Sequence, residues 1–342
     1  MRRFAALVML LALPLALSVA LRAATTAPIP DWAYAIAPPP APLPPGTTPP
    51  PNPAATDTTL RTVPGSSKQV PRNRINQTDW FPEDHPTMPS IVANGRVGDP
   101  NATACSLCHY PNGKGRPENA SVSGLPVSYF LQQLKDFRSD LRKTAEPRKA
   151  NSARMVLIAK SLTPEEMQQA AEYFGAIKWT PWVRVVETAT VPKMKSNGGI
   201  WVPIEGEGAA KEPIGMRIME TPESPEQTEV LRNPRSGTVA YVPVGSIKKG
   251  EALVKTGGNG KTIACGECHG PDLMGMGPVP GIAGRSPSYL GRELYDMQAG
   301  TRNGEWTQLM KPVVAKLTSE DLVNILAYVS SRPVAPAANA TK

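Results

Sequence analysis

The feature that most constrains this chain is a five-residue pattern, Cys-x-x-Cys-His, that occurs twice. It occupies residues 105–109 and returns 160 positions later at residues 265–269. The same offset pairs Gly124 with Gly284, Ser128-Tyr129 with Ser288-Tyr289, Leu134 with Leu294, and Asp136 with Asp296. Further on, an offset of 155 pairs Met155 with Met310 and Leu162-Thr163 with Leu317-Thr318. Such a repeat indicates two copies of one domain, which we place at residues 88–178 and 244–333.

The spacing inside the pattern has a chemical meaning. Cysteines at positions i and i+3 of a helix project from one face, and a histidine at i+4 lies one turn above the first cysteine. Two thiols placed in this way can bond to the two vinyl groups on one edge of a porphyrin while the imidazole coordinates the iron, which is how c-type haem is attached. We therefore predict two haem c groups. The predicted attachment residues are Cys105, Cys108, Cys265 and Cys268, and the predicted proximal iron ligands are His109 and His269.

Two other uses of paired cysteines stay open at this stage. Four cysteines can hold a structural zinc ion, although 156 residues separate the two pairs here. Each pair can also act as a redox disulfide of the thioredoxin type, although no strand is predicted before either pair. The chain has only three histidines, and two of them directly follow a Cys-x-x-Cys pair, which favours haem.

Methionine is the expected sixth ligand of the iron. Met155 lies 46 residues after His109, Met310 lies 41 residues after His269, and both precede the last predicted helix of their copy by the same interval. Because a His–Met pair raises the reduction potential and suits electron transfer, we predict Met155 and Met310 as axial ligands. The other methionines considered are Met167 and Met297, which are expected in the core, and Met274 and Met276, which follow His269 too closely.

His85 is the third histidine, and it precedes copy one. It has no counterpart before copy two, so we expect a surface or packing residue. The alternative is a haem ligand in one redox state.

Several segments lie outside the two copies. Residues 1–24 begin with Met1-Arg2-Arg3 and continue with an apolar run of 18 residues, which indicates a signal peptide or a retained membrane anchor. Residues 25–55 are rich in proline and are predicted to form an extended tether. An N-terminal extension follows at residues 56–87. The linking segment at residues 179–243 is predicted to contain short strands, and residues 334–342 a disordered tail.

Each copy is predicted to be mostly helical. Phe130, Leu134 and Phe137 recur at helical spacing and mark one apolar face. Thr163 and Glu166 form a capping box at the start of the last helix of copy one. Thr318 and Asp321 repeat it in copy two, where the shorter acid is expected to fit less well.

These residues resemble class I c-type cytochromes, and the tandem arrangement is similar to di-haem members with two such domains. The resemblance covers residues 88–178 and 244–333. It implies a mainly α fold, with two cytochrome c-like helical domains joined by a partly β-like linker, and it implies haem with His and Met axial ligands. A family proline whose carbonyl orients the ligating histidine is matched by Pro280, but Ala120 stands at that place in copy one.

From this resemblance we expect an electron carrier in a periplasmic or membrane-associated respiratory chain, and not an enzyme. The expected donor is a dehydrogenase or a quinol-oxidising complex, and the expected acceptor is a terminal oxidase. The alternatives are a haem enzyme, either a di-haem peroxidase or a thiosulfate-oxidising enzyme, and a haem subunit of a dehydrogenase complex. The formal charge of +8 is not gathered in a basic run, so no nucleic-acid partner is expected. Attachment to the inner membrane would run through the N-terminus.

Overall fold

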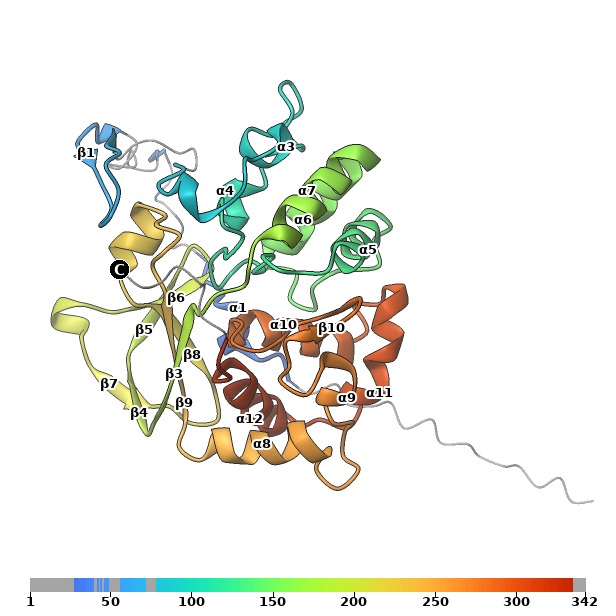
Figure 1. Cartoon of the computed structure of the whole chain (residues 1–342). Helices are drawn as coiled ribbons and strands as arrows, with labels where there is room; N and C mark the ends of the chain where they lie inside the picture. The colour runs from blue at the N-terminus through green and yellow to red at the C-terminus, as the bar shows by residue number, and fades with distance from the viewer. Residues whose placement is uncertain are drawn as a thin grey trace, which may run out of the picture.

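The computed structural model describes residues 28–39, 42, 44, 46–48, 56–71 and 78–334 (Figure 1). Copy one is drawn in cyan and green, copy two in orange and red, and the strands of the central segment lie beside copy two. The predicted leader at residues 1–24 and all but the first residue of the predicted tail fall outside the described residues. Within the described ranges, no helix has the length and apolar character needed to cross a membrane.

Copy one consists of helices packed around one apolar core. Its helices are α3 (Ser90–Ala93), α4 (Ser106–His109), α5 (Val127–Arg138), α6 (Ala150–Ser161) and α7 (Pro164–Ala176). The predicted apolar face of α5 is confirmed, because Phe130, Leu134 and Phe137 are all buried in this core. Helix α7 begins directly after Thr163. Its predicted capping box is also confirmed: the Glu166 N–H donates to the Thr163 hydroxyl at 3.2 Å, and the Thr163 N–H donates to the Glu166 carboxylate at 2.8 Å.

Copy two repeats this plan with a longer first helix. Its elements are α8 (Ser246–Thr256), α9 (Gly266–His269), β10 (Gly275–Met276), β11 (Val279–Pro280), α10 (Pro287–Gln298), the 3-10 helix η4 (Glu305–Leu309), α11 (Lys311–Val314) and α12 (Ser319–Ser330). The capping box of α12 closes as fully as that of copy one, since Thr318 N–H donates to Asp321 at 2.7 Å. The expected poorer fit of the shorter acid is therefore wrong.

The central segment forms a three-stranded sheet and two two-stranded antiparallel sheets. Its elements are β3 (Val183–Thr188), β4 (Thr190–Pro192), β5 (Met194–Asn197), β6 (Ile200–Pro203), the 3-10 helix η2 (Gly206–Gly208), β7 (Lys211–Pro213), β8 (Met219–Pro222), the π-helix η3 (Glu226–Val230) and β9 (Thr238–Pro243). The three-stranded sheet has the order β3-β9-β8, with β3 parallel and β8 antiparallel to β9. Ala240 and Val242 of β9 share an apolar core with Val323 and Leu326 of α12, so the sheet is fixed to copy two.

A short helix near the N-terminus, α1 (Asp31–Tyr34), is buried among these parts. The prediction of a tether over residues 25–55 is wrong for this stretch, because Trp32 and Tyr34 bury their rings in the core shared by α12 and the sheet. The Tyr34 hydroxyl donates to Asp296 at 2.7 Å, and the Trp201 indole donates to the Trp32 carbonyl at 2.8 Å. Aromatic burial outweighs the extended preference of the nearby prolines.

The N-terminal extension packs against the central segment. It contains the two-residue strands β1 (Leu60–Arg61) and β2 (Val70–Pro71) and the 3-10 helix η1 (Pro82–Asp84). Val63, Trp80 and Phe81 bury their side chains with Leu231 of the central segment in a small separate core. The extension and the central segment therefore support each other.

The two copies meet around a local two-fold arrangement. Arg142 and Arg302, which stand at the same position of the repeat, form an antiparallel bridge. On one side the Lys143 N–H donates to the Thr301 carbonyl at 3.0 Å, and on the other the Asn303 N–H donates to the Leu141 carbonyl at 2.7 Å. Equivalent residues thus exchange equivalent hydrogen bonds across the junction.

Candidate haem-binding sites

Each Cys-x-x-Cys-His pattern forms a single helical turn. In α4 the His109 N–H donates to the Cys105 carbonyl at 3.0 Å, and in α9 the His269 N–H donates to the Cys265 carbonyl at 2.9 Å. This turn places the second cysteine and the histidine of each pattern above the first cysteine, as the spacing requires. The sequence prediction of local geometry therefore matches the structure at both sites.

Both histidines are oriented by the same kind of hydrogen bond. Nδ1 of His109 lies 2.8 Å from the Ala120 carbonyl oxygen, and Nδ1 of His269 lies 2.7 Å from the Pro280 carbonyl oxygen. A carbonyl can only accept, so Nδ1 carries the proton and Nε2 keeps its lone pair for a metal. Burial lowers the pKa of both imidazoles, which favours this neutral form.

The missing proline of copy one has little effect on this contact. The sequence raised a doubt at Ala120, but the hydrogen bond comes from the backbone carbonyl, and alanine supplies it as well as proline.

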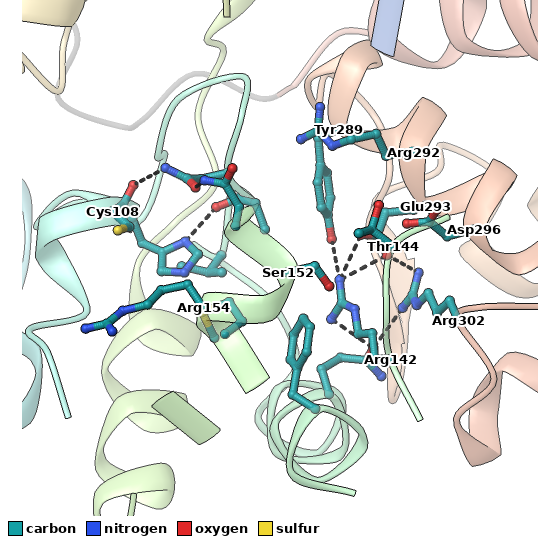
Figure 2. Close-up of a pocket in the computed structure, with 18 of the residues that line it drawn as sticks. Cys108, Arg142, Thr144, Ser152, Arg154, Tyr289, Arg292, Glu293, Asp296 and Arg302 are labelled. Atoms are coloured by element: carbon teal, nitrogen blue, oxygen red, sulfur yellow. Dashed lines mark hydrogen bonds and ion pairs between the residues drawn. The ribbon is translucent and has the colours of Figure 1, made fainter. Parts of the chain in front are cut away.

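Met155 lines the same pocket as the first attachment site. Cys108, His109 and Met155 all line this pocket. Apolar side chains cover part of its wall: Val122, Leu125, Phe130, Leu134, Phe137 and Ile158. Figure 2 shows Cys108 on one side of it and the charged residues of the domain junction on the other. The structure thus brings three of the four predicted residues of copy one around a space suited to a large, flat, mostly apolar group. The fourth, Cys105, does not line this pocket and packs against the core of copy one.

In copy two, Met310 and Cys265 both pack against the second helical core. Met310 lies where η4 ends and α11 begins. Met167 and Met297 are buried in the cores, as predicted.

The cysteines are neither bridged nor gathered around a metal. All four are among the described residues and none forms a disulfide. Within the described part of the chain, no three Cys, His, Asp or Glu side chains come together as a metal site would require. Burial raises the pKa of Cys105 to about 12 and that of Cys265 to about 11, so these thiols are protonated at neutral pH.

His85 takes no part in either site. Its Nε2 lies 3.2 Å from Asp79 and its Nδ1 lies 2.9 Å from the Pro86 carbonyl, while its ring packs against Tyr173. Both ring nitrogens are engaged in contacts with protein oxygens and His85 does not line the pocket at the first attachment site. This matches the packing role expected from the sequence.

Sequence reasoning missed a charged cluster at the junction of the two copies, which we call the junction cluster: Tyr129, Gln133, Arg142, Tyr289, Glu293 and Arg302. Arg142 donates to Glu293 at 2.9 Å and to Tyr289 at 3.2 Å. Arg302 pairs with Glu293 and donates to Tyr129 at 2.9 Å. Its members match each other at the offset of 160, so aligning the two copies residue by residue would have revealed it. One carboxylate serves two buried guanidinium groups.

Two further buried cations line the pocket, and neither has a carboxylate partner among the residues that the structure describes. The Lys149 ammonium donates to the carbonyls of Tyr34 and Gly199, at 3.0 Å each. Arg292 donates to the carbonyls of Ala33 and Pro117 at 2.6 and 2.8 Å. Burial lowers the pKa of Lys149 to about 7. This excess of buried positive charge suits a group that carries its own anions, as haem does with its two propionates.

Comparison with known proteins shows which family this chain belongs to. No family model matches the chain. Cytochrome c-554(548) of Halomonas halodenitrificans is 37% identical over 76 residues, which are 22% of this chain and 92% of that protein. The thiosulfate dehydrogenase electron acceptor of Thiomonas intermedia is 23% identical over 254 residues, 73% of this chain and 88% of that protein. Cytochrome c4 of Pseudomonas aeruginosa is 20% identical over 243 residues, 70% of this chain and 88% of that protein.

The chain belongs to the c-type cytochromes, because it is 37% identical to one of them across nearly that protein's whole length. Two further matches, over 254 and 243 residues, cover 73% and 70% of this chain. Within the family the chain is a di-haem electron carrier, with two haem c groups as its cofactors.

Proposed function

We propose that each copy holds its haem through its own Cys-x-x-Cys-His turn, with His109 and Met155 as iron ligands in copy one. His269 and Met310 have these roles in copy two. The observation that carries this proposal is the pair of Nδ1 to carbonyl hydrogen bonds, which leave Nε2 of both histidines ready to coordinate. When bound, haem iron accepts and releases one electron.

The residues around each site hold, neutralise and shield the group. The carbonyls of Ala120 and Pro280 fix the direction of the imidazole rings. Arg292 and the protonated form of Lys149 supply positive charge at the first pocket, where the propionates would neutralise it. The apolar wall limits contact with water, which favours the less charged, reduced iron and keeps the potential high.

Methionine ligation is tested by replacing one sulfur at a time. Met155→Leu and Met310→Leu are each expected to remove half of the weak Met-to-iron absorption band of the oxidised protein and to lower the reduction potential of one haem. Met167→Leu is the matched control, since Met167 is buried in the core of copy one, and it should leave both readings unchanged. If Met155→Leu and Met310→Leu kept the full band, methionine ligation would be wrong.

We also propose that a thiosulfate-oxidising dehydrogenase is the electron donor. The support is the name of a relative that this chain matches over 254 residues, the thiosulfate dehydrogenase electron acceptor of Thiomonas intermedia. Purified thiosulfate dehydrogenase with thiosulfate should then reduce both haems without another carrier. Reduction only by a quinol-oxidising complex would contradict this choice of donor.

The chain is proposed to act in the periplasm, because haem is attached to exported cytochromes c and the N-terminal sequence is typical of an export signal. The N-terminal mass of the mature protein tests this: cleavage near Ala20 or Ala24 indicates a free periplasmic carrier. A retained leader would indicate attachment to the inner membrane.

A further inference from the structure

The attachment turn of copy one is covered by the chain itself. Residues 226–235 of the central segment, which we call the cover, lie on this turn and on the loop after it. Arg232 donates to the Leu107 carbonyl inside the Cys-x-x-Cys-His turn at 2.7 Å. The Tyr110 hydroxyl donates to the Thr228 carbonyl at 3.1 Å, and the Asn112 amide donates to the Pro234 carbonyl at 3.1 Å.

The cover is held in place from its outer side by the N-terminal extension. The Trp80 indole donates to the Leu231 carbonyl at 2.7 Å, and both side chains are buried. Arg235 pairs with Asp84 at 2.6 Å and stacks over the Phe81 ring at 3.6 Å. The cysteine-bearing edge of copy one is thus closed by two packed segments of the same chain.

The equivalent surface of copy two is open. Cys268 is exposed, whereas its counterpart Cys108 is half-buried. Three apolar side chains around this turn are exposed: Ile263 by 40%, Met274 by 38% and Met276 by 55%. At the same offset, Met274 and Met276 replace Lys114 and Arg116 of copy one.

The two copies carry different charges at the positions that contact the cover in copy one. Leu107, whose carbonyl receives Arg232, corresponds to Glu267, and Asn112, which donates to the cover, corresponds to Asp272. Both carboxylates are exposed, and neither forms an ion pair within the described residues. Copy one thus shows how an arginine meets this turn, and copy two presents the same turn with two added exposed carboxylates, while Lys178 and Arg285 lie to one side in a small pocket with Met274.

We propose that the open face of copy two, formed by Ile263, Glu267, Cys268, Asp272, Met274 and Met276, is the docking surface for a protein redox partner. The partner it fits is one whose own cofactor edge is apolar and ringed by lysine or arginine, so that apolar surfaces meet at the centre and opposite charges meet at the rim. Electron-transfer complexes of this kind bury little area and rely on charge for fast encounter. The proposal rests on the electron-carrier function and specifies which copy meets the partner.

The test measures electron transfer from a basic mono-haem cytochrome c, with lysines around its haem edge, to the haem-loaded full chain by stopped-flow absorbance. The double variant Glu267→Lys with Asp272→Lys reverses the charge of the rim. We expect it to slow transfer at low ionic strength by at least about tenfold, the lower end of what steering supplies. Met274→Gln with Met276→Gln should slow transfer at high ionic strength as well, since it removes apolar contact.

The matched control is Glu205→Lys with Glu207→Lys, which changes the net charge equally on exposed residues of the central segment. It should transfer electrons as fast as the parent protein. Equal rates for Glu267→Lys with Asp272→Lys and for the parent would overturn the docking surface while leaving the carrier function intact. Reduction by ascorbate is followed in parallel, and a chain that no small reductant could reduce would overturn the function and the docking surface together.

Discussion

Glu293 gives the sharpest test of how the junction of the two copies is stabilised. Its side chain is 14% exposed and lies between Arg142 and Arg302, which are 9% and 6% exposed. Glu293→Gln keeps an oxygen that can accept from both guanidinium groups, as Gln133 already does at 3.0 and 2.8 Å. The variant therefore removes charge and changes little else.

The expected loss can be worked out from the two ion pairs. At an effective dielectric of about 20, each contributes about 4 kcal/mol of attraction at a separation of 4 Å. Several kcal/mol of this lost attraction are offset, because burying the glutamine amide has a smaller desolvation cost than burying the glutamate carboxylate. The remainder is about 3 kcal/mol, at the lower end of the range for a buried ion pair that loses one partner.

Urea denaturation of the haem-loaded protein measures this loss. The control is Glu223→Gln, which breaks the exposed pair with Arg184 and is expected to cost less than about 1 kcal/mol. If the free energy of unfolding fell equally little in Glu293→Gln and in the control, the junction cluster would not be the buried ion pair that the geometry describes.

Three further changes test other parts of the structure. Burial lowers the pKa of Lys114 to about 8. Between about pH 8 and pH 10.5 the unfolded chain therefore binds more protons at this residue than the folded chain does. Lys114 thus makes the free energy of unfolding rise with pH across that window. Lys114→Met should flatten the rise, as measured by urea midpoints at several pH values; an unchanged slope would contradict the shift. Gly250→Ala should cost about 1–3 kcal/mol of unfolding free energy, because its Cβ would overlap the Asn324 carbonyl where α8 crosses α12. An unfolding free energy equal to that of the parent protein would refute that close contact. Trp32→Ala should lower the free energy of unfolding by about 3–5 kcal/mol, because Trp32 of α1 is buried in an apolar core. A loss below about 1 kcal/mol in the same assay would mean that residues 28–36 behave as the tether predicted from the sequence.

The local structure of both sites could be predicted from sequence because short-range rules determine it. The Cys-x-x-Cys-His turns depend on helical spacing, and the capping boxes at Thr163 and Thr318 depend on three-residue contacts. The repeat also placed Met155 and Met310 at matching positions. None of these predictions needed knowledge of how distant segments pack.

The remaining features depend on contacts between residues far apart in sequence. Helix α1 is buried because Trp32 and Tyr34 pack against α12 and the sheet. The prolines nearby in the sequence predict an extended tether instead, because a local pattern does not show these distant contacts. The cover reaches the turn of copy one from more than 100 residues away, as the contact between Arg232 and Leu107 shows. Ala120 illustrates a different limit: the functional group is a backbone carbonyl, which the identity of the side chain does not reveal.

The central claim is that four cysteine sulfurs bind two haems, and the intact mass of the mature protein tests it most directly. Produced with complete haem-attachment machinery, the parent chain should weigh as much as its processed polypeptide plus two haems. The variant that replaces Cys105 and Cys108 with alanine should weigh less than the parent by one haem and two sulfur atoms. A colourless parent protein with the mass of the bare polypeptide would contradict the account.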